Sequence, residues 1–245
     1  MIGVRAVRIL SFTFAFGSVA TNLHALPPKE VYAPVEKIFI APGFDDNDNV
    51  QVSLFGNFTD TCYRVGPTGH SVDHQNREIK IWAKAYDYSS REFVCLDVLT
   101  PFLLNISVGL LQEGTYTVKV VGLNISQPLN IAHSTTDSPD EYLYAPVTHT
   151  KISTLPNGMQ KVAFSGQFQR LINGCMKLKE TKFEITSNNI LVVLPIAEVI
   201  EDNKQCVGVP IDFDGEISFH AFTDVGLLHV RVANGNSQTQ LINTP

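Results

Sequence analysis

An acidic run near the start of the chain carries side chains that could bind a metal ion. Asp45, Asp46 and Asp48 alternate with two asparagines in the stretch 45–49. Carboxylate and amide oxygens are the ligands that Ca²⁺ prefers, so the run is a candidate calcium site. It lacks the glycine and the distal glutamate of an EF-hand loop. The alternative is an ordinary solvated acidic turn.

A second group, formed by His70, Asp73 and His74, could gather around a metal if the segment were helical. It lies between a Gly-Pro-Thr-Gly turn and an alternating strand, so we do not expect that spacing to form. Motifs for hydrolases, metalloproteases and nucleotide binding are missing from the sequence. We therefore expect no enzyme and no cofactor. A hydrolase on an unusual β scaffold is the enzymatic alternative.

An aromatic and basic stripe is predicted on one face of a strand at 79–88. Its members alternate with apolar residues: Lys80, Trp82, Lys84, Tyr86 and Tyr88. Because successive side chains of a strand point to opposite faces, these five share a face. Aromatic rings beside lysines could stack on a sugar or contact a protein partner. The alternative is that a loop or the other half of the chain covers this face, since Leu191, Val193 and Pro195 in the matching segment are apolar.

The elements that must position these residues are predicted to be short strands. Apolar residues recur at every second position in 79–85 and again in 115–121. Outside the N-terminal region no stretch has the capped 3.6-residue period of a helix. About seven short strands, with a turn every 8–12 residues, predict a β-sandwich of the immunoglobulin type.

The pattern occurs twice, which predicts two tandem domains. Tyr-Ala-Pro-Val at 32–35 recurs at 144–147, and Gly114 recurs as Gly226, both 112 positions later. We align the strands at 79–107 with those at 190–218, at an offset of 111. The predicted organisation is a signal at 1–25, a first domain at 26–134, a linker at 135–143 and a second domain at 144–245.

Four cysteines allow three pairings. The internal repeat selects one disulfide in each copy, Cys62 with Cys95 and Cys175 with Cys206. The sequence has no Cys-x-x-Cys pair and no histidine at ligand spacing from a cysteine, which disfavours a metal site. Reduced, buried thiols are the alternative. Disulfides form and persist in exported proteins.

The N-terminus has the pattern of a secretory signal. Arg5 and Arg8 precede an apolar run at 9–20, and cleavage is plausible after Ala20 or Ala25. An uncleaved anchor is the alternative, although this run is shorter than the ~20 residues that span a bilayer. We expect a secreted or periplasmic protein with no membrane insertion after cleavage. Its formal net charge of −6 disfavours nucleic-acid binding.

Three motifs in the first copy carry a resemblance to a known module. They are Cys62-Tyr63, Cys95-x-x-Val98-x-x-Pro101-Phe102 and Leu111-x-x-Gly114-Thr115-Tyr116-Thr117-Val118. They resemble an immunoglobulin-like module of exported, mostly uncharacterised bacterial proteins, whose members end with a Gly-Thr-Tyr-x-Val strand. The second copy departs from the pattern, with Asp-Phe at 212–213 and Gly-Leu-Leu at 226–228. The resemblance implies tandem immunoglobulin-like sandwiches and transfers no active site.

The function that these observations favour is a non-enzymatic exported module that binds a protein or a glycan. A two-domain periplasmic chaperone is the alternative. Such chaperones use an exposed edge strand and an interdomain basic pair, which the sequence does not identify. Three triplets, at Asn57, Asn105 and Asn124, match the acceptor pattern for N-glycosylation.

Overall fold

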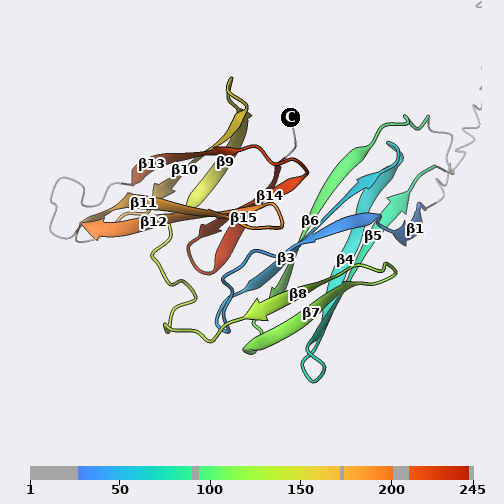
Figure 1. Ribbon diagram of the computed structural model, residues 1–245, viewed down its shortest axis with the longest axis horizontal. Coiled ribbons are helices and arrows are strands. Elements are labelled where there is room, and N and C mark those ends of the chain that lie inside the picture. The colour runs from blue at the N-terminus through green and yellow to red at the C-terminus, as the bar shows by residue number, and fades with distance from the viewer. Residues whose placement is uncertain (1–26, 90–93, 172–173, 201–209, 243–245) are drawn as a thin grey trace, which may run out of the picture.

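The computed structural model describes residues 27–89, 94–171, 174–200 and 210–242. Within these ranges the chain forms fifteen strands and no helix (Figure 1). The described residues thus contain no helix that could cross a membrane. The predicted signal at 1–25 lies outside them. The strands form four sheets, two in each half of the chain.

The first half is a β-sandwich. Its five-stranded sheet contains β1 (Lys29–Tyr32), β4 (Tyr63–Asp73), β5 (Glu78–Asp87), β7 (Gly114–Val120) and β8 (Ser126–Ile131). Its three-stranded sheet contains β2 (Val35–Phe39), β3 (Val50–Phe58) and β6 (Thr100–Gly109). Buried side chains from both sheets, such as Leu54, Ile79 and Tyr116, form one core. The predicted inward face of β5 is confirmed, because Ile79, Ile81, Ala83 and Ala85 are all buried.

The second half is a β-sandwich with the same layout. Its four-stranded sheet contains β11 (Cys175–Ile185), β12 (Ile190–Ile200), β14 (Gly226–Val232) and β15 (Asn236–Ile242). Its three-stranded sheet contains β9 (Val147–Thr154), β10 (Met159–Phe168) and β13 (Ile211–His220). A second core, with Phe164, Val193 and Val230, lies between these sheets. The all-β prediction is therefore confirmed for both halves.

One close backbone approach recurs in both sandwiches and explains why a glycine and an Ala-Pro pair occur in both copies of the repeat. Gly56 lies opposite Phe102 in the β3–β6 ladder, and Gly166 lies opposite Phe213 in the β10–β13 ladder. A Cβ on Gly56 would lie 2.1 Å from the carbonyl oxygen of the proline in the first Ala-Pro pair. On Gly166 the corresponding distance to the second Ala-Pro pair is 2.2 Å. Only glycine fits at these two positions.

The large sheet of each sandwich contains a parallel pair. β5 runs parallel to β7, and β12 runs parallel to β14. The other ladders between named strands are antiparallel, as they are throughout immunoglobulin sandwiches. The alternation of apolar residues along a strand predicts which face each residue occupies. It does not predict which strand lies beside it, so the sequence did not indicate these parallel pairs.

The alignment of 79–107 with 190–218 is wrong by one residue at β12. It predicts that Ile190 and Val192 occupy the core face, but the second core contains Leu191, Val193 and Ala197 instead. A shift of one residue along a strand moves every side chain to the opposite face. Both faces of β12 are apolar, so the periodicity of the sequence could not distinguish the two phases.

The predicted Cys62–Cys95 disulfide is confirmed, with a Cα–Cα distance of 5.3 Å. Cys175 is also disulfide-bonded. Its predicted partner, Cys206, falls in the stretch 201–209, which is outside the described residues. Within the described part of the chain, Cys62 and Cys95 therefore fasten the start of β4 to the segment that leads into β6.

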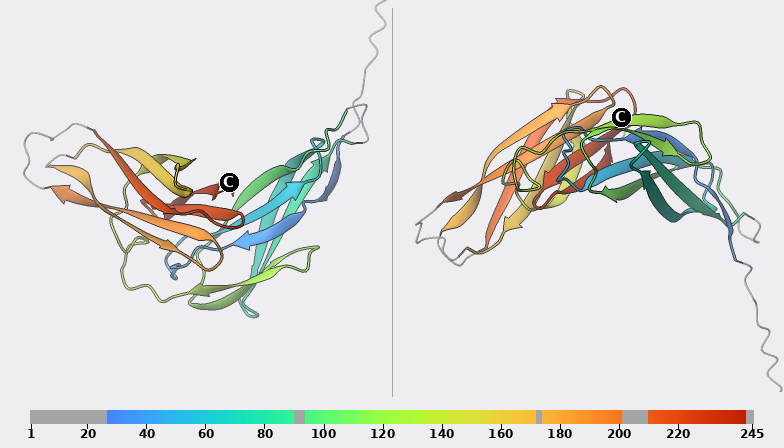
Figure 2. Two further views of the ribbon diagram at one scale, coloured as in Figure 1. Left: turned by 45° about the horizontal axis from the view of Figure 1, so that its top comes forward. Right: turned by 90° about the horizontal axis from the view of Figure 1, so that it is seen from below.

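The two sandwiches meet at an angle, and the yellow-green segment between β8 and β9 runs along one side of them (Figure 2). Apolar side chains pack across the junction between the two sandwiches. Three side chains of the second half, Ile190, Val192 and Leu227, belong to the core cluster of the first half. β12 and β14 consequently bury one face in their own sandwich and the other face against the first one.

Candidate functional site

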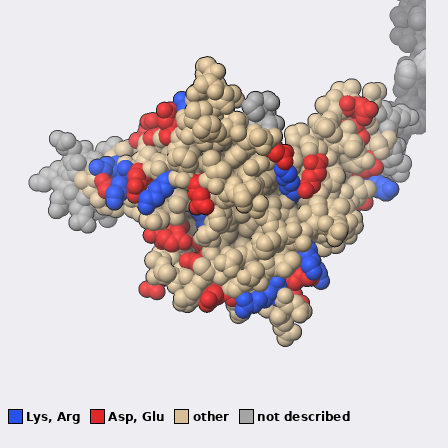
Figure 3. Space-filling model, viewed as in Figure 1, with Lys and Arg blue, Asp and Glu red and all other residues tan. Residues whose placement is uncertain are grey.

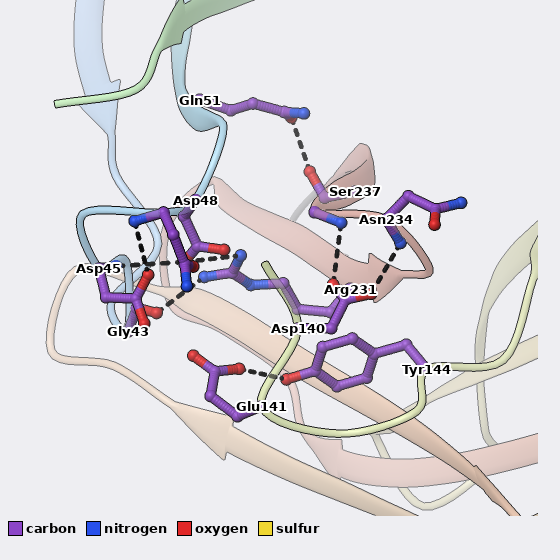
Figure 4. A network of polar contacts seen from close by, with 12 residues as sticks. Gly43, Asp45, Asp48, Gln51, Asp140, Glu141, Tyr144, Arg231, Asn234 and Ser237 are labelled. Carbon is purple, nitrogen blue, oxygen red and sulfur yellow. Dashed lines mark hydrogen bonds and ion pairs between the residues drawn. The ribbon is translucent and has the colours of Figure 1, made fainter. Parts of the chain in front are cut away.

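A buried ion pair joins the two sandwiches (Figure 4). Arg231, on β14, places its guanidinium 3.5 Å from the Asp48 carboxylate and donates a hydrogen bond of 3.0 Å to the carbonyl oxygen of Gly43. The same guanidinium lies 4.5 Å above the ring of Phe44. Asp48 is fully buried and Arg231 is only 5% exposed. Because a buried charge is unfavourable unless it is paired, this contact makes the loop before β3 and strand β14 depend on each other.

Two buried groups have shifted pKa values: Asp48, in this pair, and His229, beside it. Burial raises the pKa of Asp48 to about 6, although Arg231 acts in the opposite direction. Burial lowers the pKa of His229 to about 3, and the positive charge of Arg231 lowers it further. The His229 ring meets the Phe44 ring edge-on, with centroids 6.3 Å apart. Near neutral pH, His229 is therefore uncharged inside the junction.

The predicted linker is fastened to both sandwiches rather than free. The Asp140 carboxylate accepts hydrogen bonds of 2.7 and 2.8 Å from the backbone N–H groups of Asn234 and Gly235, in the β14–β15 turn (Figure 4). Asn47, before β3, donates through its side chain to the carbonyl oxygens of Thr136 and Ser138. The segment between the halves thus stabilises the angle at which they meet.

The calcium candidates lie within this junction, and each already has partners in the chain. Asp48 pairs with Arg231 and also accepts from the backbone N–H of Asp45. Asp45 accepts from the backbone N–H of Asn47, and Asp46 accepts from the backbone N–H of Ser134. The carboxylates therefore contact protein groups. Calcium binding stays a prediction that has to compete with these contacts.

In the described part of the chain, one group of side chains is close enough to hold a metal ion. It consists of Asp60, Cys62 and Cys95. The two sulfur atoms form the disulfide and so do not provide thiolates. His70 and Asp73 lie on β4, an extended strand, so the helical spacing that a His70–His74 site required does not form.

The predicted aromatic stripe forms an open surface on the outer face of β5. Trp82 is 36% exposed. A Cβ on Gly69 of the neighbouring strand β4 would lie 2.4 Å from the indole ring, so the indole packs directly on the Gly69 backbone. Tyr32 of β1 is also exposed, and the Lys84 ammonium lies 3.6 Å from the centroid of its ring. Aromatic rings and a lysine thus lie side by side on this face.

The rest of the stripe is charged or partly covered. Lys80 lies 3.0 Å from Glu78, and Lys119 of β7 contacts the same carboxylate. Hydrogen bonds from these lysines, that from Lys119 above all, lower the pKa of Glu78. Tyr86 and Tyr88 are half-buried. The two lysines border a hollow of about 330 Å³ beside the β7–β8 turn.

The second half does not cover Lys80 and Trp82 of this face, which counts against interdomain packing as the explanation for that part of the stripe. Trp82 and Lys80 are exposed, whereas the face of β12 that meets the first half carries Ile190 and Val192. The apolar Leu191 and Val193 instead lie in the core of the second sandwich. On the face of the molecule in Figure 3, basic and acidic residues are interspersed.

The comparisons with known proteins concern the first sandwich. Residues 52–131, from β3 to the end of β8, match the family model of the ORF11 beta-sandwich domain. This match covers about a third of the chain and supports a β-sandwich module. No curated protein and no solved structure matches the chain.

The sequence did not identify Arg231 and His229 as important residues. One signal was available, because residues 227–230 read Leu-Leu-His-Val and do not alternate with polar residues as 115–120 do. Near-continuous apolar character indicates a strand that is buried on both faces. The partner of such a strand, more than 180 positions away at Asp48, could not be inferred.

Replacing Arg231 with methionine should destabilise the protein. The substitution leaves the Asp48 carboxylate buried without its partner, which typically lowers the free energy of unfolding by about 3–5 kcal/mol. Denaturant unfolding of the wild type and of R231M measures this difference. In the control, Lys161→Met breaks the exposed pair of Lys161 with Glu216, which is worth about 1 kcal/mol or less. Equal effects of both substitutions would contradict the role of the buried pair.

Replacing His229 with leucine should reduce the acid sensitivity of the fold. Its pKa is about 3 in the folded chain and 6.5 as a free side chain, so the unfolded state binds the proton first and stability falls as pH drops below about 6.5. Between pH 6.5 and 5 the wild type should lose roughly 2 kcal/mol more than H229L. Unfolding free energies measured at both pH values test this, and parallel pH profiles would refute it.

Proposed function

We propose that this chain is an exported, non-enzymatic binding module whose first sandwich holds a glycan on the outer face of β5. We further propose that the chain arose by tandem duplication of one sandwich. Trp82 is the centre of the site, and Lys80, Lys84, Tyr86 and Tyr88 surround it. The observation that carries the proposal is that the Trp82 indole packs on Gly69 while a third of the side chain stays exposed.

The tandem arrangement is supported by the agreement between the halves. Strands β2 to β8 correspond in order to β9 to β15, and both large sheets contain the parallel pair at the same place. Both small sheets hold a glycine against a phenylalanine and a proline carbonyl. Two unrelated sandwiches would not share these three features, so one ancestral unit accounts for them best.

The contrast between the two equivalent sheet faces supports a binding role for the first. Every residue of β14 from Gly226 to Arg231 is buried, because its outer face packs on the first sandwich. β7 occupies the equivalent place in the first half, and its residues alternate between buried and exposed, with Thr115, Thr117 and Lys119 exposed. One copy of this face therefore serves the junction. The other copy is open to a ligand.

The chemistry of the open face fits a sugar. An aromatic ring has a flat, weakly negative face, which attracts the positively polarised edges of a ligand. The apolar C–H face of a pyranose can stack on such a ring while nearby polar groups bind its hydroxyls. Lys84, Lys80 and Glu30 supply these groups around Trp82. The indole rests on Gly69, so it is held in place before the ligand arrives.

Export is supported by the N-terminal pattern and by the cysteines. Residues 1–25 have the charge and hydrophobic order of a secretory signal. The Cys62–Cys95 bond and the bonded state of Cys175 suit an oxidising compartment. We place the protein in the periplasm or outside the cell, without insertion into the membrane.

A two-domain chaperone is the second candidate. Two outer strands favour it, because β4 pairs only with β5 among the named strands and β11 pairs only with β12. The edge of such a strand can accept another chain. Against it, the buried cation at the junction, Arg231, is already paired with Asp48. A protein client that binds while glycans do not would favour this second function.

The glycan site can be tested by fluorescence, because Trp82 is the only tryptophan of the chain. Titration with a panel of neutral and acidic oligosaccharides should shift its emission for at least one sugar. Trp82→Ala should then weaken binding at least tenfold, measured by calorimetry, whereas Trp82→Phe should keep part of it. Phe183→Ala, at an exposed aromatic residue of β11, is the matched control and should bind like the wild type.

Stability measurements separate a binding role from a structural one. A loss of about 3 kcal/mol or more in W82A, as seen for core truncations, would make the residue structural. Gly69→Ala gives a second check, since the added Cβ would clash with the indole and displace it without removing it. Unchanged affinity in both W82A and G69A would contradict the proposed site.

A further inference from the structure

A polar cleft lies between the two sandwiches, away from the Trp82 surface. It has a volume of about 440 Å³ and receives side chains from β3 and β6 of the first half and from β9 and β15 of the second. All eight lining residues are uncharged, and each carries a hydroxyl or an amide: Gln51, Asn105, Ser107, Thr148, Thr150, Ser237, Gln238 and Thr239. The volume falls within the usual range of small-ligand sites.

Three amides of this cleft are each held at one atom and leave the other atom available. Ser53 donates a hydrogen bond of 2.7 Å to the Asn105 side-chain oxygen, and Ser237 donates one of 2.6 Å to that of Gln51. Gln238 donates through its side-chain nitrogen to the Val147 carbonyl oxygen, at 2.7 Å.

In the described part of the chain, no hydrogen bond occupies Asn105 Nδ2, Gln51 Nε2 or Gln238 Oε1. The cleft therefore offers two fixed donors and one fixed acceptor beside its hydroxyls. Groups that are oriented before binding lose little conformational entropy when a ligand arrives.

The lining selects one class of ligand. A charged ligand would lose its hydration without meeting an opposite charge in the lining. An apolar ligand would exclude water from the open amide atoms of Asn105, Gln51 and Gln238 and leave them without hydrogen-bond partners. A ligand rich in hydroxyls both donates and accepts, so it satisfies amides and hydroxyls together. We propose that this interdomain cleft binds a short, neutral oligosaccharide through hydrogen bonds to both sandwiches.

This site goes beyond the Trp82 surface, and it shares no residue with it. Its two walls belong to different halves, and the hydrogen bond from Ser237 to Gln51 joins them directly. The cleft keeps its shape only while the junction keeps its angle. Ligand bound there contacts both halves and should therefore raise the unfolding temperature of the whole chain.

The test is an amide NMR titration of the full mature chain with maltotriose, cellotriose, chitotriose and an array of other neutral oligosaccharides. At least one sugar should shift amide signals that cluster at residues 51, 105–107, 148–150 and 237–239. Trigalacturonic acid, which is charged, should leave these signals in place. A panel in which no neutral sugar shifts them would overturn the proposal.

Variants separate this site from the Trp82 surface. Thr239→Val removes one hydroxyl that has no hydrogen bond within the described residues, so the fold should be unaffected. Combined with Asn105→Ala, it should weaken binding in the cleft at least tenfold, while Trp82→Ala leaves that affinity unchanged. Wild-type affinity in the folded T239V/N105A variant would refute the cleft. If W82A abolished the binding assigned to the cleft, the sugar would bind at the Trp82 surface and not in the cleft.

Discussion

The structure depends on two neighbouring strands, β12 and β14, that are buried on both faces. β12 and β14 pack Leu191, Val193 and Val230 into their own sandwich and turn Ile190, Val192 and Leu227 toward the first one. Burying apolar surface on both sides removes it from water and stabilises the junction as well as the second core. The same burial requires that any charge on β14 be neutralised, which the pair of Arg231 and Asp48 achieves. The junction is thus part of the fold and not an incidental contact.

The open surfaces follow from this packing. The two sandwiches use their equivalent sheets differently: β12 and β14 of the second half pack against the first half. The outer face of β5 in the first half therefore stays accessible, with Trp82 on it. The fixed angle also creates the cleft between β6 and β15, since its walls come from opposite sides of the junction. A flexible linker would allow the cleft to open and close. The contacts of Asp140 and Asn47 oppose that motion.

Much of the fold could be predicted from the sequence because it rests on local alternation and on the internal repeat, which selected the cysteine pairing. The inward residues of β5, the Cys62–Cys95 bond and the all-β class are confirmed. The phase of β12 was wrong because both of its faces are apolar, and alternation carries no information in such a strand. The position of Trp82 on an outer face was predictable, but its support by Gly69 depends on the pairing register of β4 with β5. The junction pair and the cleft join residues from distant parts of the chain, and no local pattern marks them.

The central claim, that these two strands make the two sandwiches one cooperative unit, is tested most directly by scanning calorimetry of the mature chain. A shared core predicts one unfolding transition whose van 't Hoff and calorimetric enthalpies agree. Two separate transitions, each with about half of the total enthalpy, would contradict the claim.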